Sequence, residues 1–339
     1  MPKAVCFSQF GLENLHQVSQ PSKPLGAFDL RVSPKAVSLN YRDFLMIQGL
    51  YNPKLKLPII PCSDGAGIVT EIGSSVTGFR PGDRVCSVMI PDWESGEPGH
   101  NILQTTLGGP LDGMLATEVV HPEHAFVKLP DSIPFPAGAC LPVAGLTAWN
   151  SLVSFGKISQ GSKVLLLGTG GVSMMALQIA KTLGAEVVVT SGSEEKLEKA
   201  RTMGADHGIN YRLHPEWWRK VLEWSHLGVD LVLEVGGAGT FNQSVRAVRM
   251  GGKIALIGVL AESNSPVQLV PVLMKNIQVQ GILVGHRQAF REYLQFVEHH
   301  QLEPPIDRIF QGFEKVSLAF QTMAKGHHFG KLVINIDEA

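Results

Sequence analysis

The stretch that decides the fold of this chain is Lys163-Val164-Leu165-Leu166-Leu167-Gly168-Thr169-Gly170-Gly171-Val172-Ser173. It reads as a short buried strand that runs straight into a glycine-rich turn and then into a helix. Gly168 permits the tight turn, Gly170 lets the backbone approach a ligand, and the first turn of the helix offers free N–H groups to an anion. The plain alternative is a strand–turn–helix elbow. In this context we expect the turn to hold the pyrophosphate of a dinucleotide.

The helix after this turn is predicted from the spacing of its apolar residues. One buried face is formed, at the i, i+3, i+4, i+7 spacing, by Val172, Met175, Ala176, Ile179, Ala180 and Leu183. Gly184 is placed to end the helix. The third glycine of the usual fingerprint is Ser173 here, and a small Ser fits a position that serves helix–strand packing.

Compact apolar runs alternate with helical spacing from about residue 135 to about residue 270. The expected strands are Lys163–Leu167, Glu186–Val189, His207–Tyr211, Asp230–Val235, Lys253–Ile257 and Gln278–Leu283. Such a βαβ series predicts a parallel sheet covered by helices. The fold class is therefore α/β, with a doubly wound, Rossmann-type parallel sheet over residues 128–270.

The remaining residues have a different texture. The first 125 or so contain short apolar runs cut by Gly and Pro, with turn signals such as Arg80-Pro81-Gly82-Asp83, which predicts an antiparallel, β-rich domain. Residues 330–336 form a late strand that we expect to rejoin that domain. We therefore assign residues 1–127 and 271–339 to a catalytic domain into which the dinucleotide domain is inserted.

Composition narrows the class of protein. With 339 residues, 44% of them hydrophobic, the chain can bury two cores, and a net charge of −1 supplies no broad basic field for nucleic acid or an anionic membrane. No secretory leader and no membrane-length apolar run is evident, so we expect a soluble, cytoplasmic protein. The four cysteines are far apart, which excludes a cysteine-clustered zinc and argues against disulfides.

The type of dinucleotide is argued from charge. An NAD site usually has an Asp or Glu at the end of the second strand, where this chain has Ser191-Gly192-Ser193. The absence of a carboxylate removes the repulsion that a 2′-phosphate would feel, while Lys196 adds positive charge and Tyr211 a hydroxyl. Alternatively, Ser193 only caps the next helix and Lys196 is solvated. We expect NADP(H) in preference to NAD(H).

Four stretches in order carry a resemblance to a known family: Ser38–Asp43, Pro61–Val69, Pro81–Val85 and Gly145–Ala148. Over essentially its whole length the chain resembles the medium-chain dehydrogenase/reductase superfamily, which implies a GroES-like catalytic domain beside the Rossmann domain. The Leu39-Asn40-Tyr41-Arg42-Asp43 run is similar to that of the zinc-free branch of quinone oxidoreductases and enoyl reductases.

The resemblance also implies what is missing. The positions of the catalytic zinc ligands in the alcohol dehydrogenases look like Asn40, Ser63 with Asp64, and Val143 here, and these side chains are not a zinc ligand set. The cysteine-rich lobe of a structural zinc is replaced by Pro91–Gly96, which could line a pocket. We therefore expect no zinc.

Without a metal, hydride transfer works best on an acceptor that is already activated. We expect reduction of a quinone or an α,β-unsaturated carbonyl, with Asn40, Tyr41 and Asp64 as catalytic candidates. Tyr41 would donate to the developing oxyanion or deliver a proton, and solvent is the alternative. Asp43 is expected to tie its loop through Arg42 or a backbone amide. The alternatives are an alcohol or aldehyde dehydrogenase-like oxidoreductase, and an NADPH-binding sensor or structural protein with little turnover.

Cofactor contacts are expected from several segments. The candidates are Asn40, Thr147, Gly168, Gly170, Gly171, Val172, Ser191, Lys196, Tyr211, Gly258, Val259, Leu283, Val284 and Lys331. Those from Thr147, Gly258-Val259 and Leu283-Val284 rest on the resemblance and would lie beside the nicotinamide. Lys331 is expected either to reach the pyrophosphate or to be a surface residue. The apolar stretch Val267–Met274 before the last sheet strand predicts a homodimer that pairs at this edge.

Overall fold

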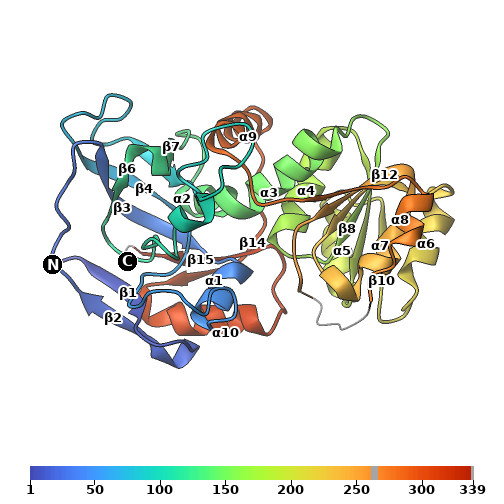
Figure 1. Ribbon diagram of the computed structural model, residues 1–339, viewed down its shortest axis with the longest axis horizontal. Coiled ribbons are helices and arrows are strands. Elements are labelled where there is room, and N and C mark those ends of the chain that lie inside the picture. Colours follow the sequence, from blue (N-terminus) through green and yellow to red (C-terminus); the bar gives the residue numbers. More distant parts are fainter. Residues whose placement is uncertain (261–265, 337–339) are drawn as a thin grey trace. The chain divides into compact units, whose positions relative to one another are not determined.

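Two folded units make up the chain in the computed structural model, which describes residues 1–260 and 266–336. The first unit is Met1–Leu146 with His286–Ala339, and the second is Thr147–Gly285. Figure 1 shows the elements of both units along the chain. We describe each unit by itself.

The second unit is built on a sheet of six strands in the order β10-β9-β8-β11-β12-β13, and every neighbouring pair is parallel. The strands are β8 (Lys163–Leu167), β9 (Glu186–Ser191), β10 (His207–Asn210), β11 (Val229–Glu234), β12 (Val248–Leu256) and β13 (Gln278–Gly281). This is the predicted Rossmann-type sheet. The strand expected at Lys253 already begins at Val248, because an irregular register opposite β11 lets the pairing start earlier.

Helices cover this sheet. They are α3 (Leu146–Trp149), η5 (Asn150–Gly156), α4 (Gly171–Thr182), α5 (Glu194–Thr202), α6 (Trp217–Ser225), η6 (Gly237–Gly239), α7 (Phe241–Ala247) and α8 (Val270–Met274). The strand order reverses direction at β8, so right-handed crossovers put α4 and α5 on one face and the helices after β10 on the other. In the described residues, no helix is both long enough and apolar enough to cross a bilayer.

Helix α4 confirms the apolar spacing in the sequence. Met175, Ile179 and Ala180 are buried, and Gly184 follows the helix with a left-handed φ of +78° that favours glycine. Ser173, in the place of a third glycine, is buried and its Oγ donates to the Leu167 carbonyl at 2.7 Å. The departure from the fingerprint therefore adds a bond between helix and strand.

The first unit is β-rich, as predicted. Its larger sheet has the order β14-β15-β3-β4-β5-β7, with β6 also pairing to β3, and β1 and β2 form a separate ribbon. The strands are β1 (Lys3–Phe7), β2 (Leu15–Ser19), β3 (Asp29–Ser38), β4 (Asp64–Ile72), β5 (Arg84–Ser87), β6 (Val119–Pro122), β7 (Phe126–Lys128), β14 (Ile306–Gln311) and β15 (Lys331–Asn335). The late strand β15 pairs antiparallel with β3, which confirms the expected return of the chain.

Short helices complete this unit. They are η1 (Leu12–Asn14), α1 (Tyr41–Ile47), η2 (Ile102–Thr105), η3 (Glu123–Ala125), α2 (Phe135–Cys140), η4 (Leu141–Gly145), α9 (Arg287–His300), η7 (Phe313–Lys315) and α10 (Val316–Ala324). A core that includes Phe7, Phe126, Phe320 and Leu332 joins elements from both ends of the chain. The fold therefore brings residues more than 300 positions apart, such as Phe7 and Leu332, into one hydrophobic cluster.

The limits of the two units differ from those expected from the sequence. The first crossing is at Leu146 and not near residue 127, because α2 packs against β3, β4 and β15. The second is at Gly285 and not near residue 270, because β13 pairs in parallel with β12. Packing moves both boundaries toward the C-terminus.

Candidate active site

Polar residues meet at one end of the larger sheet, where β3 finishes and its neighbours β4 and β15 begin. Val333 of β15 pairs with Ser38 of β3, and Ser38 pairs with Asp64, the first residue of β4. Asn40 lies two residues after Ser38, and Lys331 two residues before Val333. Because both pairings are antiparallel, the register places Lys331, Asn40 and Asp64 at the same sheet edge.

Asn40 caps the start of α1 and is held by the residues that follow it. Its backbone N–H donates to Asp43 Oδ2 at 2.8 Å, and Asp43 lies 3.9 Å from the Arg42 guanidinium. Both expected ties of Asp43 are therefore present. Burial raises the pKa of this carboxyl to about 6, although the charge of Arg42 opposes the rise. Asp43 has no exposed surface.

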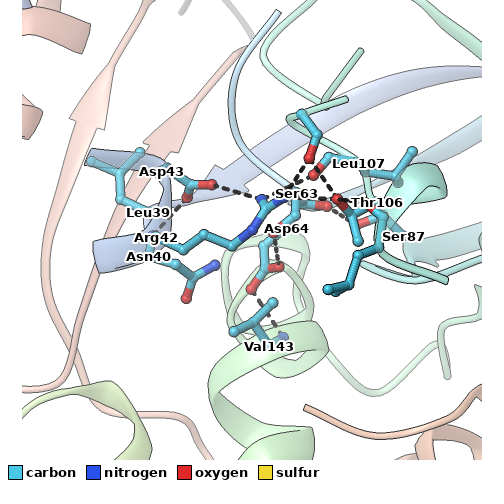
Figure 2. A network of polar contacts seen from close by, with 12 residues as sticks. Leu39, Asn40, Arg42, Asp43, Ser63, Asp64, Ser87, Thr106, Leu107 and Val143 are labelled. Atoms are coloured by element: carbon cyan, nitrogen blue, oxygen red, sulfur yellow. Dashed lines mark hydrogen bonds and ion pairs between the residues drawn. The ribbon is translucent and has the colours of Figure 1, made fainter. Parts of the chain in front are cut away.

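The Arg42 side chain connects α1 to a distant loop. It donates to the carbonyls of Leu107 (3.1 Å) and Gly109 (2.6 Å) and to the hydroxyl of Thr106 (2.9 Å). Figure 2 shows these hydrogen bonds of the Arg42 guanidinium, with Asp43 and Asp64 nearby. The start of α1 is thereby fixed by Asp43, which binds the Asn40 backbone, and by Arg42, which binds the loop.

Asp64 is fully buried and accepts hydrogen bonds on both carboxylate oxygens. Ser63 Oγ donates to Oδ1 at 2.9 Å, and the Val143 backbone N–H donates to Oδ2 at 3.1 Å (Figure 2). Burial raises the pKa of Asp64, while Lys331, Asn40 and these two donors oppose the rise. Its geometry is that of an anchor between β4 and η4, and a direct catalytic contact stays a prediction.

Lys331 does not lie on the surface, so that expected alternative is wrong. The residue is only 3% exposed, and its Nζ donates to the Leu39 carbonyl and to Asn40 Oδ1, each at 2.7 Å. The burial follows from the position of β15 directly beside β3. Contact with a pyrophosphate stays a prediction, but the ammonium already has two acceptors within the first unit.

Among the three catalytic candidates, Tyr41 is the exposed one. It is the first residue of α1, it is 41% exposed, and its ring centroid lies 5.6 Å from that of Phe44. Asn40 is 8% exposed and Asp64 is not exposed at all. A phenolic hydroxyl that remains accessible can donate a hydrogen bond or a proton to a substrate oxygen.

The glycine turn of the second unit fits a phosphate group. Gly168 has a φ of +72°, and a Cβ added at Gly168 or at Gly170 would meet no atom within 4 Å. The backbone there is bare and faces open space, and the N–H groups of the first turn of α4 begin at Gly171, followed by the half-buried Val172. Bare backbone at a helix N-terminus suits an anion such as a pyrophosphate.

The ends of β9 and β10 converge beside this turn. A Cβ at Gly192 would lie 2.7 Å from the Tyr211 hydroxyl and 2.9 Å from Arg212 Nε, so both side chains pack over the glycine. Ser191 is buried, and its Oγ accepts from the Ser193 N–H at 3.3 Å. Sequence reasoning missed Arg212, although a cation directly after a strand end is a readable signal.

The carboxylates near these strand ends are neutralised within their own helix. Glu194 pairs with Arg201 at 3.0 Å, and Glu195 pairs with Lys199 at 2.8 Å. Ser193 caps this helix by accepting from the backbone N–H of Lys196, so the expected capping role is present. Lys196 itself is half-buried.

The segments expected beside the nicotinamide lie in the second unit. Thr147 is 2% exposed and its carbonyl accepts from Ser151, while Val259 after β12 is 75% exposed. Val284, preceded by the half-buried Leu283, has a φ of +51°, which is rare for a β-branched residue, and its carbonyl accepts from Asn150 Nδ2 at 2.9 Å.

A buried carboxylate that the sequence did not reveal supports the loop after β11. Glu234 accepts from the backbone N–H groups of Gly236 (2.7 Å) and Gly237 (3.0 Å) and from the hydroxyls of Thr240 and Ser244. Gly237 in turn packs against Val259, and Gly258 against the Val235 carbonyl. Glu234 therefore fixes the shape of a segment that backs the expected cofactor contacts.

Family models and relatives identify the chain. The model described as Alcohol dehydrogenase GroES-like domain matches residues 26–131, and Zinc-binding dehydrogenase matches residues 171–299. A zinc-type alcohol dehydrogenase-like protein of Schizosaccharomyces pombe is 39% identical over 91% of each chain. The chain belongs to the medium-chain dehydrogenase/reductase superfamily. Within this superfamily it is a nicotinamide-dependent oxidoreductase with a GroES-like and a Rossmann domain.

Solved members of the superfamily share the fold. A putative alcohol dehydrogenase from Sinorhizobium meliloti is 42% identical, with a TM-score of 0.90 and 99% of both chains covered. A quinone oxidoreductase from Coxiella burnetii is 26% identical, with a TM-score of 0.81 and 99% of both chains covered. Alcohol dehydrogenase and quinone oxidoreductase relatives are therefore both present.

The name of the matching dehydrogenase model implies zinc, but the residues at the sheet edge do not fit it. Asn40 and Ser63 are poor ligands, Val143 offers only a backbone N–H, and the ammonium of Lys331 lies on Asn40. Within residues 1–260 and 266–336, no cluster of three or more His, Cys, Asp or Glu side chains could hold a metal.

The segment Pro91–Gly96 is held by ion pairs and backbone hydrogen bonds to the start of α9. Glu94 pairs with Arg291 at 2.7 Å and also with Arg287, and the Arg287 backbone N–H donates to the Trp93 carbonyl at 2.9 Å. The segment Pro91–Gly96, expected to line a pocket, thus caps the N-terminus of α9 within the first unit.

Proposed function

We propose that the protein is an NADPH-dependent, zinc-independent oxidoreductase that reduces a quinone or an α,β-unsaturated carbonyl. The observation that carries this proposal is the polar cluster at the start of α1. There, Asp64 accepts from the Ser63 hydroxyl and the Val143 backbone N–H, and Asn40 Oδ1 accepts from Lys331, and these contacts support a site that works without a metal.

A reduced nicotinamide supplies hydride when it is bound. The residues of this chain must then accommodate the negative charge that develops on the substrate oxygen. A conjugated acceptor spreads this charge into an enolate or phenolate, which a hydrogen-bond donor can stabilise without a Lewis acid. In this proposal Tyr41, an exposed residue, donates to that oxygen or gives it a proton, and solvent is the alternative donor.

The preference for NADPH is supported by charge at the ends of β9 and β10. Tyr211 and Arg212 pack over Gly192, and Lys196 follows the Ser193 cap. Glu194 and Glu195, which would repel a 2′-phosphate, are paired with Arg201 and Lys199. The balance of charge at this corner therefore favours an additional phosphate.

The decisive experiment is an NADPH-oxidation panel of quinones, enones, alkenals and simple aldehydes with the purified protein, accompanied by elemental analysis. We expect turnover of conjugated acceptors and well under one zinc per chain. Turnover of unconjugated aldehydes alone would instead support an alcohol dehydrogenase-type activity. Binding of NADPH without turnover of any compound would support a sensor or structural role.

We also propose a cytoplasmic homodimer. β13 is the outermost strand of its sheet, and the adjacent α8 segment exposes Leu269, Val270, Leu273 and Met274, each by 70% or more. An apolar patch beside an open strand edge suits pairing with a second copy. For the cytoplasmic location, the support is that the four cysteines are free and buried, which suits a reducing compartment.

The dimer is tested by the mass of the protein in solution. Light scattering should give twice the chain mass, and Leu273→Glu should give the monomer; a monomeric starting protein would refute the proposal.

A further inference from the structure

Two carboxylates are buried without any exposed surface at the start of α1 and β4. They are Asp43 and Asp64, and each needs a positive charge nearby because an isolated buried carboxylate is strongly disfavoured. Arg42 Nη1 lies 3.9 Å from Asp43 Oδ1, and Nη1 and Nη2 also donate hydrogen bonds to the loop Thr106–Gly109. Lys331 is a second cation of this cluster, because the pairing of β15 with β3 and of β3 with β4 brings it to the same end of the sheet as Asp64.

Lys331 reaches the cluster through the residues just before Tyr41. Its ammonium donates to the carbonyl of Leu39 and to Asn40 Oδ1, and with the amide oxygen so occupied, Nδ2 of Asn40 is turned away from Lys331. This Nδ2 is buried and has no partner at hydrogen-bonding distance and angle, which is rare for a buried donor. Because an ammonium only donates, the contact with Lys331 favours the orientation in which Oδ1 faces it.

We propose that Lys331 is a positioning residue whose ammonium holds the Leu39-Asn40 segment, and with it Tyr41, and acts as the fixed counter-charge of Asp64. It brings an ammonium group to the end of the sheet where Asn40 and Asp64 lie. Its effect on catalysis rests on the proposed function, whereas the counter-charge role does not.

The groups that respond to Lys331 lie on every element around it. They are Asp43 beside Arg42 on α1, Asp64 on β4, Cys62 before β4, and Cys140 on α2. Burial raises the pKa of both thiols, which therefore stay neutral between pH 5 and 8. Within that range the carboxylates are the groups whose ionisation depends on the ammonium.

The test is a double-mutant cycle of Lys331→Met and Asp64→Asn, read as the urea unfolding equilibrium at pH 5 and pH 8. Without the ammonium, folded Asp64 keeps its proton to higher pH than it does in the unfolded chain, so stability falls as pH rises. Lys331→Met should increase the unfolding equilibrium constant relative to the starting protein. We expect the factor of this increase to be at least about tenfold larger at pH 8 than at pH 5. In the Asp64→Asn background this pH-dependent loss should largely disappear.

The matched control is Lys253→Met in the second unit. Its Nζ donates to the Phe155 and Gly156 carbonyls, so we expect a loss that does not change with pH. An equal loss for Lys331→Met at both pH values and in both backgrounds would overturn the counter-charge role. If Lys331→Met does not fold, the double variant decides: its folding supports the proposal, and its failure to fold overturns it.

The positioning role has a separate kinetic readout. For a quinone that the protein reduces, we expect Lys331→Met to lower kcat at least about tenfold while KM changes less than about threefold. An unchanged kcat would overturn this part. If no compound of the panel is turned over, the proposed function fails, but the unfolding cycle still decides the counter-charge role.

Discussion

The glycine turn after β8 and the polar cluster before α1 prepare their units for ligands in opposite ways. The turn uses bare backbone: Gly168 and Gly170 face open space, and their neighbours present N–H groups. The cluster uses buried side chains: Lys331 donates to Asn40, and Asp64 accepts from Ser63 and the Val143 backbone at the same end of the sheet. The first arrangement is local in sequence, whereas the second depends on residues almost 300 positions apart.

The largest effect is expected where the backbone arrangement is given a charge. Gly170 has a φ of −79°, which any residue adopts, and its Cβ direction is free, so Gly170→Asp should fold and can even cap α4. A carboxylate at the pyrophosphate position should weaken NADPH binding at least about 100-fold, because like charges repel at close range. Fluorescence titration measures this.

Gly170→Ala is the control for that experiment. It adds bulk without charge, and the open space at Gly170 predicts a change in affinity of less than about tenfold. If Gly170→Asp bound NADPH as tightly as the starting protein, the turn would not be the phosphate site, and the contrast between the two regions would lose its first half.

A second prediction concerns the exposed member of the other region. Tyr41→Phe removes the hydroxyl and retains the ring that packs near Phe44. We expect kcat for a conjugated acceptor to fall by about 10- to 100-fold with the NADPH affinity unchanged, because general-acid groups contribute on this order or more. Steady-state kinetics and cofactor titration measure the two quantities. An unchanged kcat would assign proton delivery to solvent.

The sequence was sufficient for the fold because the decisive signals are local. Strand β8, the turn and helix α4 follow each other directly, and apolar spacing and Gly184 locate the helix and its end. The domain limits at Leu146 and Gly285 could not be located in this way. They depend on which sheet a helix or strand joins, and that is a property of tertiary packing.

The candidate site was predicted only in part for the same reason. Asn40 and Asp64 are recognisable from their motifs, but their partner Lys331 is 291 residues from Asn40, and its burial follows from strand register. Glu234 could not be predicted either, since a carboxylate at a strand end gains its role from the loop that packs on it. Contacts between residues that are far apart in the sequence cannot be predicted from the spacing of residues within a short motif.

A smaller effect is expected at the 2′-phosphate corner. Arg212→Ala removes a guanidinium that packs over Gly192, and Lys196→Ala removes the ammonium after the cap. Each should reduce the preference for NADPH over NADH by about tenfold, measured as the ratio of dissociation constants, because a phosphate bond to a charged donor is stronger than a neutral one. Equal affinities for the two cofactors in the starting protein would refute the NADPH assignment.

The smallest effect is expected for the exposed charges that hold the loop Pro91–Gly96. Burial alone would raise the pKa of Glu94, but the hydrogen bonds from Arg291 and Arg287 hold this pKa below its ordinary value. Such a carboxylate stabilises the fold above its unfolded pKa and loses that contribution as pH falls through the folded value. Because the Glu94 side chain is 49% exposed, Glu94→Gln should cost about 1 kcal/mol or less at neutral pH and less in high salt. Urea unfolding at two salt concentrations measures it. A loss as large as that of Lys331→Met at pH 8, and unchanged by salt, would mean that exposed and buried charges contribute alike, and the cluster at α1 would no longer be distinctive.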